Sequence, residues 1–351
     1  MERYLIGTHI EAYPYEDSKL SIYNKNTGKT FVLGDKEAKV FKLMNGANTV
    51  SDIQSECKYY TNEDIIKLAD AFAKIGLFDK EKTKFNPFKI KLRLFNPNKF
   101  FKENRIITKI LHYSICVGAP VFFLIAFFSM RVLNPDPVAF ISNSLAAFSM
   151  IRIRDIIIIA VLSLFCLALH ELGHMITAKK YGVNVPEIGI MLYFLIPCAY
   201  TNISGINLLK SKGKRLVVLL SGTLVNIGLI GVCYLLMALS TSVTLGMYCV
   251  ALIIVNLGTI FMNTMILIKF DGYYIIETIL DEPKLREKAI GHLLSFVRLS
   301  LSRDKESKKK FRVSVSEESN MLQHITYCVY AILSLTYVPF IIINTVIPFI
   351  F

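Results

Sequence analysis

His170 and His174 lie four residues apart in the stretch His170-Glu171-Leu172-Gly173-His174. On an α-helix this spacing puts both imidazoles on one face, one turn apart. Two neutral imidazoles placed in this way can hold one zinc ion, and the carboxylate of Glu171 can act as a general base toward water. These residue types at this spacing therefore predict metal-assisted hydrolysis.

The surroundings of the motif suggest where that chemistry takes place. Residues 156–177 are almost wholly apolar apart from this cluster, and about 20 such residues suffice to cross a bilayer. Ionisable groups at membrane depth are costly, so their presence there indicates a functional site. We therefore expect hydrolysis inside a membrane.

The composition agrees with a membrane protein. The chain has 351 residues, of which 53% are hydrophobic, and its mean hydropathy is +0.47. The net charge of +13 could suggest a nucleic-acid partner. However, the basic residues gather before the first apolar run and between later ones, as the positive-inside rule predicts. The seven cysteines lack paired spacing and predict neither a disulfide framework nor a Cys-based zinc site.

Long apolar runs predict an all-α polytopic membrane protein with about five transmembrane helices. A shorter run, residues 187–199, contains Pro197 and is expected to be re-entrant or strand-like. The asymmetry of the basic residues predicts a multi-pass protein of the bacterial cytoplasmic membrane, with the N-terminus in the cytoplasm and the C-terminus outside. The stretch 130–154 could cross the bilayer, lie on it or leave it. The five predicted spans are 107–129, 155–178, 215–239, 244–268 and 324–350.

Residues 1–83 predict a small α+β domain with a winged-helix-like outline. A β-hairpin is expected within residues 19–32, with a turn at Asn26-Thr27-Gly28. Residues 84–105 are basic and rich in Phe, which predicts a linker on the membrane surface. The membrane domain follows over residues 106–351. Three short helices follow the hairpin, with predicted N-terminal caps at Asp35, at Thr49 or Ser51, and at Thr61.

A catalytic zinc needs a third protein ligand and an open coordination position. The best candidate is Asp271, which precedes Gly272 at the predicted inner end of the fourth span. We therefore expect one Zn²⁺ per chain, held by His170, His174 and Asp271.

At this point the chain resembles the site-2 protease family of intramembrane zinc metalloproteases, over about residues 155–275. Three elements occur in the family's order: His-Glu-x-x-His in a spanning helix, Ser221-Gly222-Thr223-Leu224-Val225-Asn226 in the next span, and Asn263 followed by Asp271-Gly272. Within the third element, Ile266 stands where the family has a proline, and Phe270 stands where it usually has a leucine before Asp-Gly.

The resemblance implies a role for each matched residue. His170, His174 and Asp271 would bind zinc, and Glu171 would move a proton from water to the leaving amine. Asn226 would donate to the developing oxyanion, although it could instead be a hydrogen-bond partner between helices. Asn263 could be structural and orient Asp271. Residues 187–199, which lie outside the three matched elements, could pair with an extended substrate by strand addition.

The N-terminal region has a weaker resemblance to PqqD-like recognition domains. These domains bind the leader peptides of ribosomally made, modified peptides. The resemblance rests on the hairpin, on Leu43-Met44-Asn45-Gly46 and on the final Ile75-Gly76-Leu77-Phe78. Residues 20–32 would then offer an edge strand to a peptide. The combination resembles peptide-maturation metalloproteases of bacteriocin-like systems.

Other functions remain open at this stage. The chain could cut a membrane-bound anti-sigma factor, or bind peptide without cutting it, as an immunity or export partner. A membrane-tethered transcription regulator is a further alternative, but no clustered basic helix supports it, and no nucleic acid is expected. His112, His292 and His324 stand unaccompanied in the sequence and predict no catalytic role. Residues 305–310 predict a loop that faces anionic lipid.

Overall fold

A computed structural model describes most of the chain. The protein divides into two compact units, Met1–Asn256 and Leu257–Phe351. The described residues are 3–15, 19–25, 29–78, 89–97, 106–193, 196–282, 284–301 and 318–341.

The first unit begins with a three-stranded antiparallel sheet in the order β2-β3-β4. Its strands are β2 (Ile10–Tyr15), β3 (Lys19–Asn24) and β4 (Lys29–Leu33). The predicted hairpin is confirmed as β3 and β4, while its turn, residues 26–28, lies outside the described residues. The sequence analysis missed β2, and also the short pair β1 (Arg3–Leu5) and β5 (Asn45–Thr49).

Three helices follow, as predicted: α1 (Asp35–Leu43), α2 (Val50–Glu56) and α3 (Asn62–Lys74). Thr49 and Thr61 each cap a helix through a complete capping box, which satisfies backbone N–H groups that the first turn leaves open. The predicted cap at Asp35 is wrong. Gly34 occupies that N-cap position, and Asp35 lies in the first turn, where its charge favours the helix dipole.

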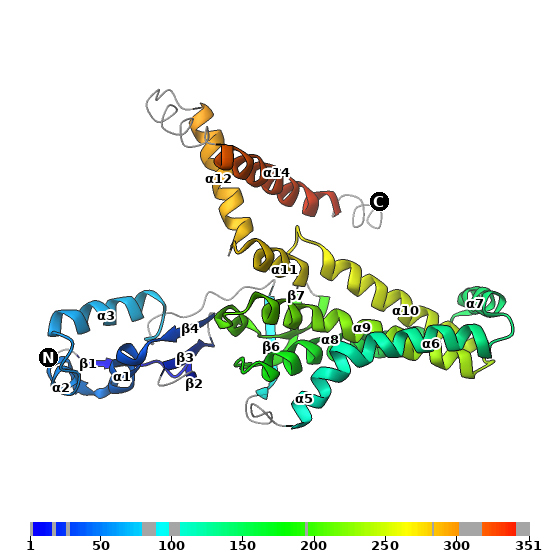
Figure 1. Ribbon diagram of the computed structural model, residues 1–351, viewed down its shortest axis with the longest axis horizontal. Helices are drawn as coiled ribbons and strands as arrows, with labels where there is room; N and C mark the ends of the chain where they lie inside the picture. The colour runs from blue at the N-terminus through cyan, green and yellow to red at the C-terminus, as the bar shows by residue number, and fades with distance from the viewer. Residues whose placement is uncertain are drawn as a thin grey trace. The chain divides into compact units, whose positions relative to one another are not determined.

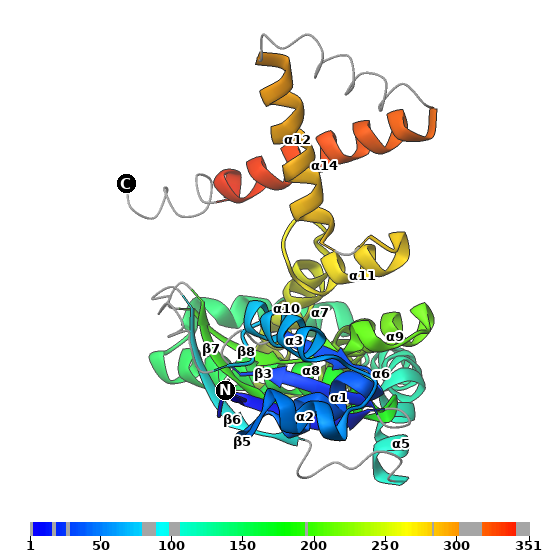
Figure 2. The same cartoon turned by 90° about the vertical axis from the view of Figure 1, so that its left-hand side faces the viewer.

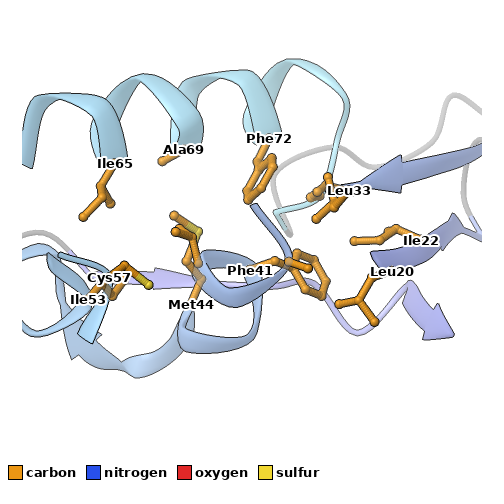
Figure 3. Packing of buried hydrophobic residues seen from close by; sticks show 13 residues of the cluster. Leu20, Ile22, Leu33, Phe41, Met44, Ile53, Cys57, Ile65, Ala69 and Phe72 are labelled. Atoms are coloured by element: carbon orange, nitrogen blue, oxygen red, sulfur yellow. The ribbon is translucent and has the colours of Figure 1, made fainter. Parts of the chain in front are cut away.

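The N-terminal sheet and helices α1 to α3 share a hydrophobic core. Figure 3 shows Phe72 of α3 above Phe41 of α1, with side chains of the sheet beside them. These apolar groups come from both the hairpin and the helices, so the described residues between 3 and 78 share one core. The core side chains labelled in Figure 3 are Leu20, Ile22, Leu33, Phe41, Met44, Ile53, Cys57, Ile65, Ala69 and Phe72.

Four helices among the described residues are long and apolar enough to cross a membrane. They coincide with four of the five predicted spans to within a few residues. The first contains a π-helical turn, η1 (Ser114–Gly118), between α5 and α6, and α6 lies alongside α9 (Figure 1). The four are Ile106–Leu133 (α5 Ile106–Tyr113, η1 and α6 Ala119–Leu133), α8 (Ile153–Lys180), α9 (Lys212–Leu239) and α10 (Val243–Thr264).

The stretch 130–154 contains a short apolar helix, Pro137–Met150. It is made of α7 (Pro137–Ala146) and the 3-10 turn η2 (Ala147–Met150). Asp136 caps α7 by accepting a hydrogen bond from the Ala139 amide at 2.9 Å. At this length the segment is too short for a full span, so its relation to the bilayer stays a prediction.

A second three-stranded antiparallel sheet lies beside the long helices, in the order β6-β7-β8. The strand-like interpretation of residues 187–199 is confirmed by β7 (Ile188–Tyr193) and β8 (Ile196–Thr201). The third strand, β6 (Lys89–Phe95), comes from the predicted linker and pairs with β7. The sequence analysis missed this strand. The rest of the linker, except residues 96 and 97, lies outside the described residues.

The second unit contains α11 (Asp271–Leu280), α12 (Leu285–Leu301) and α14 (Glu318–Ile341). Figure 2 shows α14 crossing α12, and a shared hydrophobic cluster that includes Tyr273, Leu285 and Ala331 packs in this unit. The predicted fifth span corresponds to α14, but residues 342–351 lie outside the described part, as does the predicted lipid-facing loop 305–310. The fifth span therefore stays a prediction.

Candidate metal centre and active site

His170 and His174 lie on α8, and both side chains are buried. Their Nε2 atoms are 3.1 Å apart, so the two imidazoles converge on one point, as the i, i+4 spacing predicts. Two donor nitrogens of a tetrahedral zinc site, with bonds of about 2.0–2.1 Å, lie about 3.3 Å apart. The observed separation fits that requirement.

A backbone carbonyl of α9 sets the protonation of His174. The Nδ1 atom of His174 lies 2.8 Å from the carbonyl oxygen of Val218. A carbonyl can only accept, so Nδ1 carries the proton and donates it. The unprotonated Nε2 then faces His170, which is the tautomer that a metal ligand needs.

Gly222 of α9 lies directly against the two imidazoles. A Cβ added at this position would be 2.6 Å from Nε2 of His170 and closer still to Nε2 of His174. Gly173, between the histidines, is similarly close to α9, with its added Cβ 3.0 Å from the Ser221 carbonyl oxygen. The sequence analysis placed Gly222 in a family motif; in the folded protein its missing side chain leaves space in front of the ligand atoms.

Glu171 follows His170 on α8 and is half-buried. The hydroxyl of Thr201, the last residue of β8, donates to the Glu171 carbonyl oxygen at 3.1 Å. This bond holds one end of the second sheet against the helix that carries the motif. Thr201 could not be found from the sequence, because it lies 30 residues from Glu171 and carries no motif.

Asn226 lies on α9 one turn after Gly222, so both project from the same face of that helix. Its side chain is buried, and its Nδ2 atom has no hydrogen-bond partner among the described residues. A buried donor without a partner costs about 1–3 kcal/mol. Within the described part of the chain, Nδ2 therefore does not form the hydrogen bond between helices that was the alternative role for this residue.

Asp271 begins α11 in the second unit and is partly buried. A Cβ added at Gly272 would be 2.7 Å from the carbonyl oxygens of Asn263 and Thr264. Only glycine therefore lets the first turn of α11 pack against the end of α10. The proline expected from the family is not needed to end that helix, because α10 ends at Thr264, before Ile266.

The N-terminal sheet contacts the segment that follows β8. Asn202 donates through Nδ2 to the Tyr23 hydroxyl at 3.0 Å, and the hydroxyls of Thr30 and Ser204 are 2.7 Å apart. Tyr23 is fully buried and also hydrogen-bonds Glu187. Burial first, and then the Glu187 carboxylate, raise the pKa of Tyr23, which therefore stays a neutral donor.

Comparison with known proteins gives one finding. A model of Peptidase family M50 matches residues 157–341, more than half of the chain. No curated protein and no solved structure matches it. The matched region contains the His-Glu-x-x-His helix, Gly222, Asn226 and Asp271, and the four apolar helices indicate a multi-pass membrane protein. The chain therefore belongs to Peptidase family M50, the site-2 protease family of intramembrane metalloproteases.

Proposed function

We propose that this protein is an intramembrane zinc endopeptidase whose metal ligands are His170, His174 and Asp271. The observation that carries the proposal is the convergence of two buried imidazole Nε2 atoms, 3.1 Å apart, with Gly222 leaving space in front of them. The donor set, two imidazoles and one carboxylate, is one that catalytic zinc sites use. When bound, zinc supplies Lewis acidity toward the scissile carbonyl and toward water.

The protein's own groups carry the remaining steps. The Glu171 carboxylate takes a proton from the attacking water and passes it to the leaving amine, so it acts as base and then as acid. The buried Nδ2 of Asn226 donates to the oxygen of the scissile carbonyl as negative charge develops there. The Val218 carbonyl holds His174 in the ligand tautomer throughout.

An extended peptide would bind along the second sheet. β8 is an edge strand of that sheet, and its last residue, Thr201, contacts the Glu171 backbone. Strand addition on this edge would supply main-chain hydrogen bonds to a substrate and bring it toward the catalytic helix. Cleavage is expected in the cytoplasmic half of the bilayer, with the N-terminus in the cytoplasm and the C-terminus outside.

The substrate that we propose is a ribosomally made, modified peptide of the bacteriocin type, whose leader binds residues 1–83. The three-stranded sheet followed by three helices supports a recognition domain of the PqqD type. The edge strand expected within residues 20–32 would be β4 (Lys29–Leu33), because β3 is hydrogen-bonded on both sides and β4 ends this sheet among the described residues.

The contact between the N-terminal sheet and the region of the proposed active site supports the idea that a peptide bound to the sheet is cleaved by the same protein chain. Besides the hydrogen bond from Asn202 to Tyr23, Arg93 of β6 forms an ion pair with Glu11 of β2 at 3.7 Å. A pocket is lined by Pro14 and Ser21 of the sheet and by residues 181–184, directly after the catalytic helix. A leader held by the sheet would therefore keep its attached peptide close to the site.

The metal ligands are tested by measuring zinc in the full-length, detergent-purified protein. We expect His170→Ala and Asp271→Ala each to lose one equivalent of zinc relative to the wild type. Zinc that is lost with His170 but kept without Asp271 would show that another residue is the third ligand. Equal zinc in all three proteins would overturn the metal site.

The protease function is tested in cells by mass spectrometry of small peptides. We expect a peptide precursor to accumulate uncut with Glu171→Gln, while zinc content stays unchanged. A bacteriocin-like precursor would support the substrate proposal, and an accumulating anti-sigma factor would replace it with a regulatory role. Full biological function in Glu171→Gln would instead favour a peptide-binding immunity or export partner.

A further inference from the structure

The second unit contains a group of metal-binding side chains that the proposed active site does not use. His292 of α12 and His324 of α14 face each other, with Nε2 of one 2.5 Å from Nδ1 of the other. The expectation that these histidines are unaccompanied is therefore wrong. Cys328 joins them, and its Sγ atom lies 3.8 Å from Nε2 of His324.

The helical positions explain why the three groups meet. His324 and Cys328 are four residues apart, so they lie on one face of α14. His292 projects from α12, which packs against α14 through the cluster containing Leu285, Ala289 and Tyr330. One donor atom from each of His292, His324 and Cys328 can be chosen so that all three lie within 4.8 Å of one another.

We propose that His292, His324 and Cys328 form a second metal site, which binds one zinc ion or a similar borderline-soft divalent cation. Tetrahedral zinc with about 2.1 Å bonds to nitrogen and about 2.3 Å bonds to sulfur separates its donors by about 3.3–3.6 Å. Side-chain rotations that change the donor separations by about 1 Å, well within rotamer freedom, would reach this geometry. Two imidazoles and a thiolate do not suit Mg²⁺ or Ca²⁺, which prefer oxygen ligands.

The three side chains are all half-buried, so a cation can reach them while water is partly excluded. Aromatic rings flank the group in edge-on geometry. The ring centroids of Phe296 and His324 are 5.1 Å apart, and those of Tyr327 and His292 are 5.7 Å apart. A bound ion would join α12 to α14 across the connecting residues 302–317. Three protein donors leave one tetrahedral position for water or a further donor.

The same spacing elsewhere in the chain provides a matched control. His112 and Cys116 are also four residues apart, with Sγ 3.6 Å from Nδ1. Neither belongs to a group of three possible metal ligands among the described residues. This pair has the local His–Cys contact but belongs to no such group of three. A variant at Cys116 therefore distinguishes the loss of a metal ligand from the loss of a simple side-chain contact.

The test uses the metal-free, full-length protein in detergent, titrated with Co²⁺. A thiolate bound to Co²⁺ gives a near-ultraviolet charge-transfer band, which the proposed catalytic ligands cannot give because they include no sulfur. We expect the band in the wild type and in Cys116→Ser, and we expect its loss in Cys328→Ser. Absence of the band in the wild type, or its survival in Cys328→Ser, would overturn the proposal.

Two further variants protect the result against misfolding and against confusion with the active site. His292→Ala keeps the thiol but removes a donor from the other helix, and we expect at least about 10-fold weaker Co²⁺ binding at the thiolate site. The double variant His170→Ala/His174→Ala should keep the band at full intensity. A band lost in that double variant would assign it to the first site and contradict a second one, whereas failure of the protease proposal alone would leave the band intact.

Discussion

The two histidine clusters of this protein differ in how they are built. His170 and His174 come from one helix, are almost completely buried, and have a backbone carbonyl and a glycine arranged around them. His292 and His324 come from two helices, are half-buried, and have a cysteine as neighbour. The first cluster adjoins a carboxylate that can move protons, whereas no carboxylate of the described residues belongs to the second.

This difference indicates two uses of a metal ion. In the proposed function, the first cluster has Glu171 as general base and the buried amide of Asn226 as donor on the helices that form it, which is what hydrolysis needs. The second has a cysteine thiol and two imidazoles from neighbouring helices, which as metal ligands suit cross-linking better than catalysis. A histidine pair alone therefore does not define an active site; the groups around it do.

Removal of the Glu171 carboxylate should give the largest difference in activity between a change at the first cluster and a change at the second. We expect Glu171→Gln to lower kcat by about 10²–10⁴-fold, because the general base is lost, while both metal sites stay filled. Peptide cleavage and metal content are measured on the same preparation. Cys328→Ser is the counterpart and should retain wild-type kcat. Equal losses in both variants would mean that the clusters do not have separate roles.

Asn226→Ala is expected to lower kcat by about 10²–10³-fold through loss of the oxyanion donor. KM should change little, because the ground-state carbonyl interacts weakly with that donor. Steady-state kinetics on a peptide substrate would separate the two constants. An unchanged kcat would leave Asn226 as a packing residue and remove one feature that distinguishes the first cluster.

Gly222→Ala should weaken metal binding at the first cluster at least about 10-fold, because the new methyl group would push the imidazoles out of position. Binding at the second cluster should not change. A Co²⁺ titration measures total metal binding, and the Co²⁺–thiolate charge-transfer band reports the second cluster in the same sample. Gly258→Ala is the control, since a Cβ at that helical glycine meets nothing within 4 Å.

The smallest effect is expected at the contact with the N-terminal sheet. Tyr23→Phe keeps the buried ring but removes the hydroxyl that contacts Asn202 and Glu187. We expect KM for a leader-bearing peptide to rise a few-fold, as each buried hydrogen bond that is lost costs about 1 kcal/mol. The kcat for a leaderless peptide and the metal content of both clusters should be unchanged. A raised KM for the leaderless peptide as well would place Tyr23 in the cleavage site rather than in leader recognition.

Features coded by short segments could be predicted from the sequence. The His-Glu-x-x-His pair, the caps at Thr49 and Thr61 and four apolar helices each depend on residues within a few turns of one another. The cap predicted at Asp35 is wrong because a local pattern cannot tell an N-cap from a first-turn acid. Both positions favour the same residue types.

Features that depend on tertiary packing could not be predicted in this way. β6 pairs with β7 about 100 residues later, and the pairing register follows from both strands together. His292 and His324 looked isolated because they are 32 residues apart and meet only when α12 packs on α14. Similarly, Gly222 fits a family motif in the sequence, but its contact with the imidazoles exists only in the folded protein.

The hydrogen bonds at the end of β8 have a consequence for how this segment can change during evolution. Thr201 contacts Glu171 and the next residue, Asn202, contacts Tyr23, so two neighbours serve two different partners. Successive side chains along an extended strand point to opposite sides, and a shift of one residue exchanges them. An insertion or deletion of a single residue in β8 should therefore exchange these two contacts, so that the side chain that meets the Glu171 backbone would turn toward Tyr23 instead.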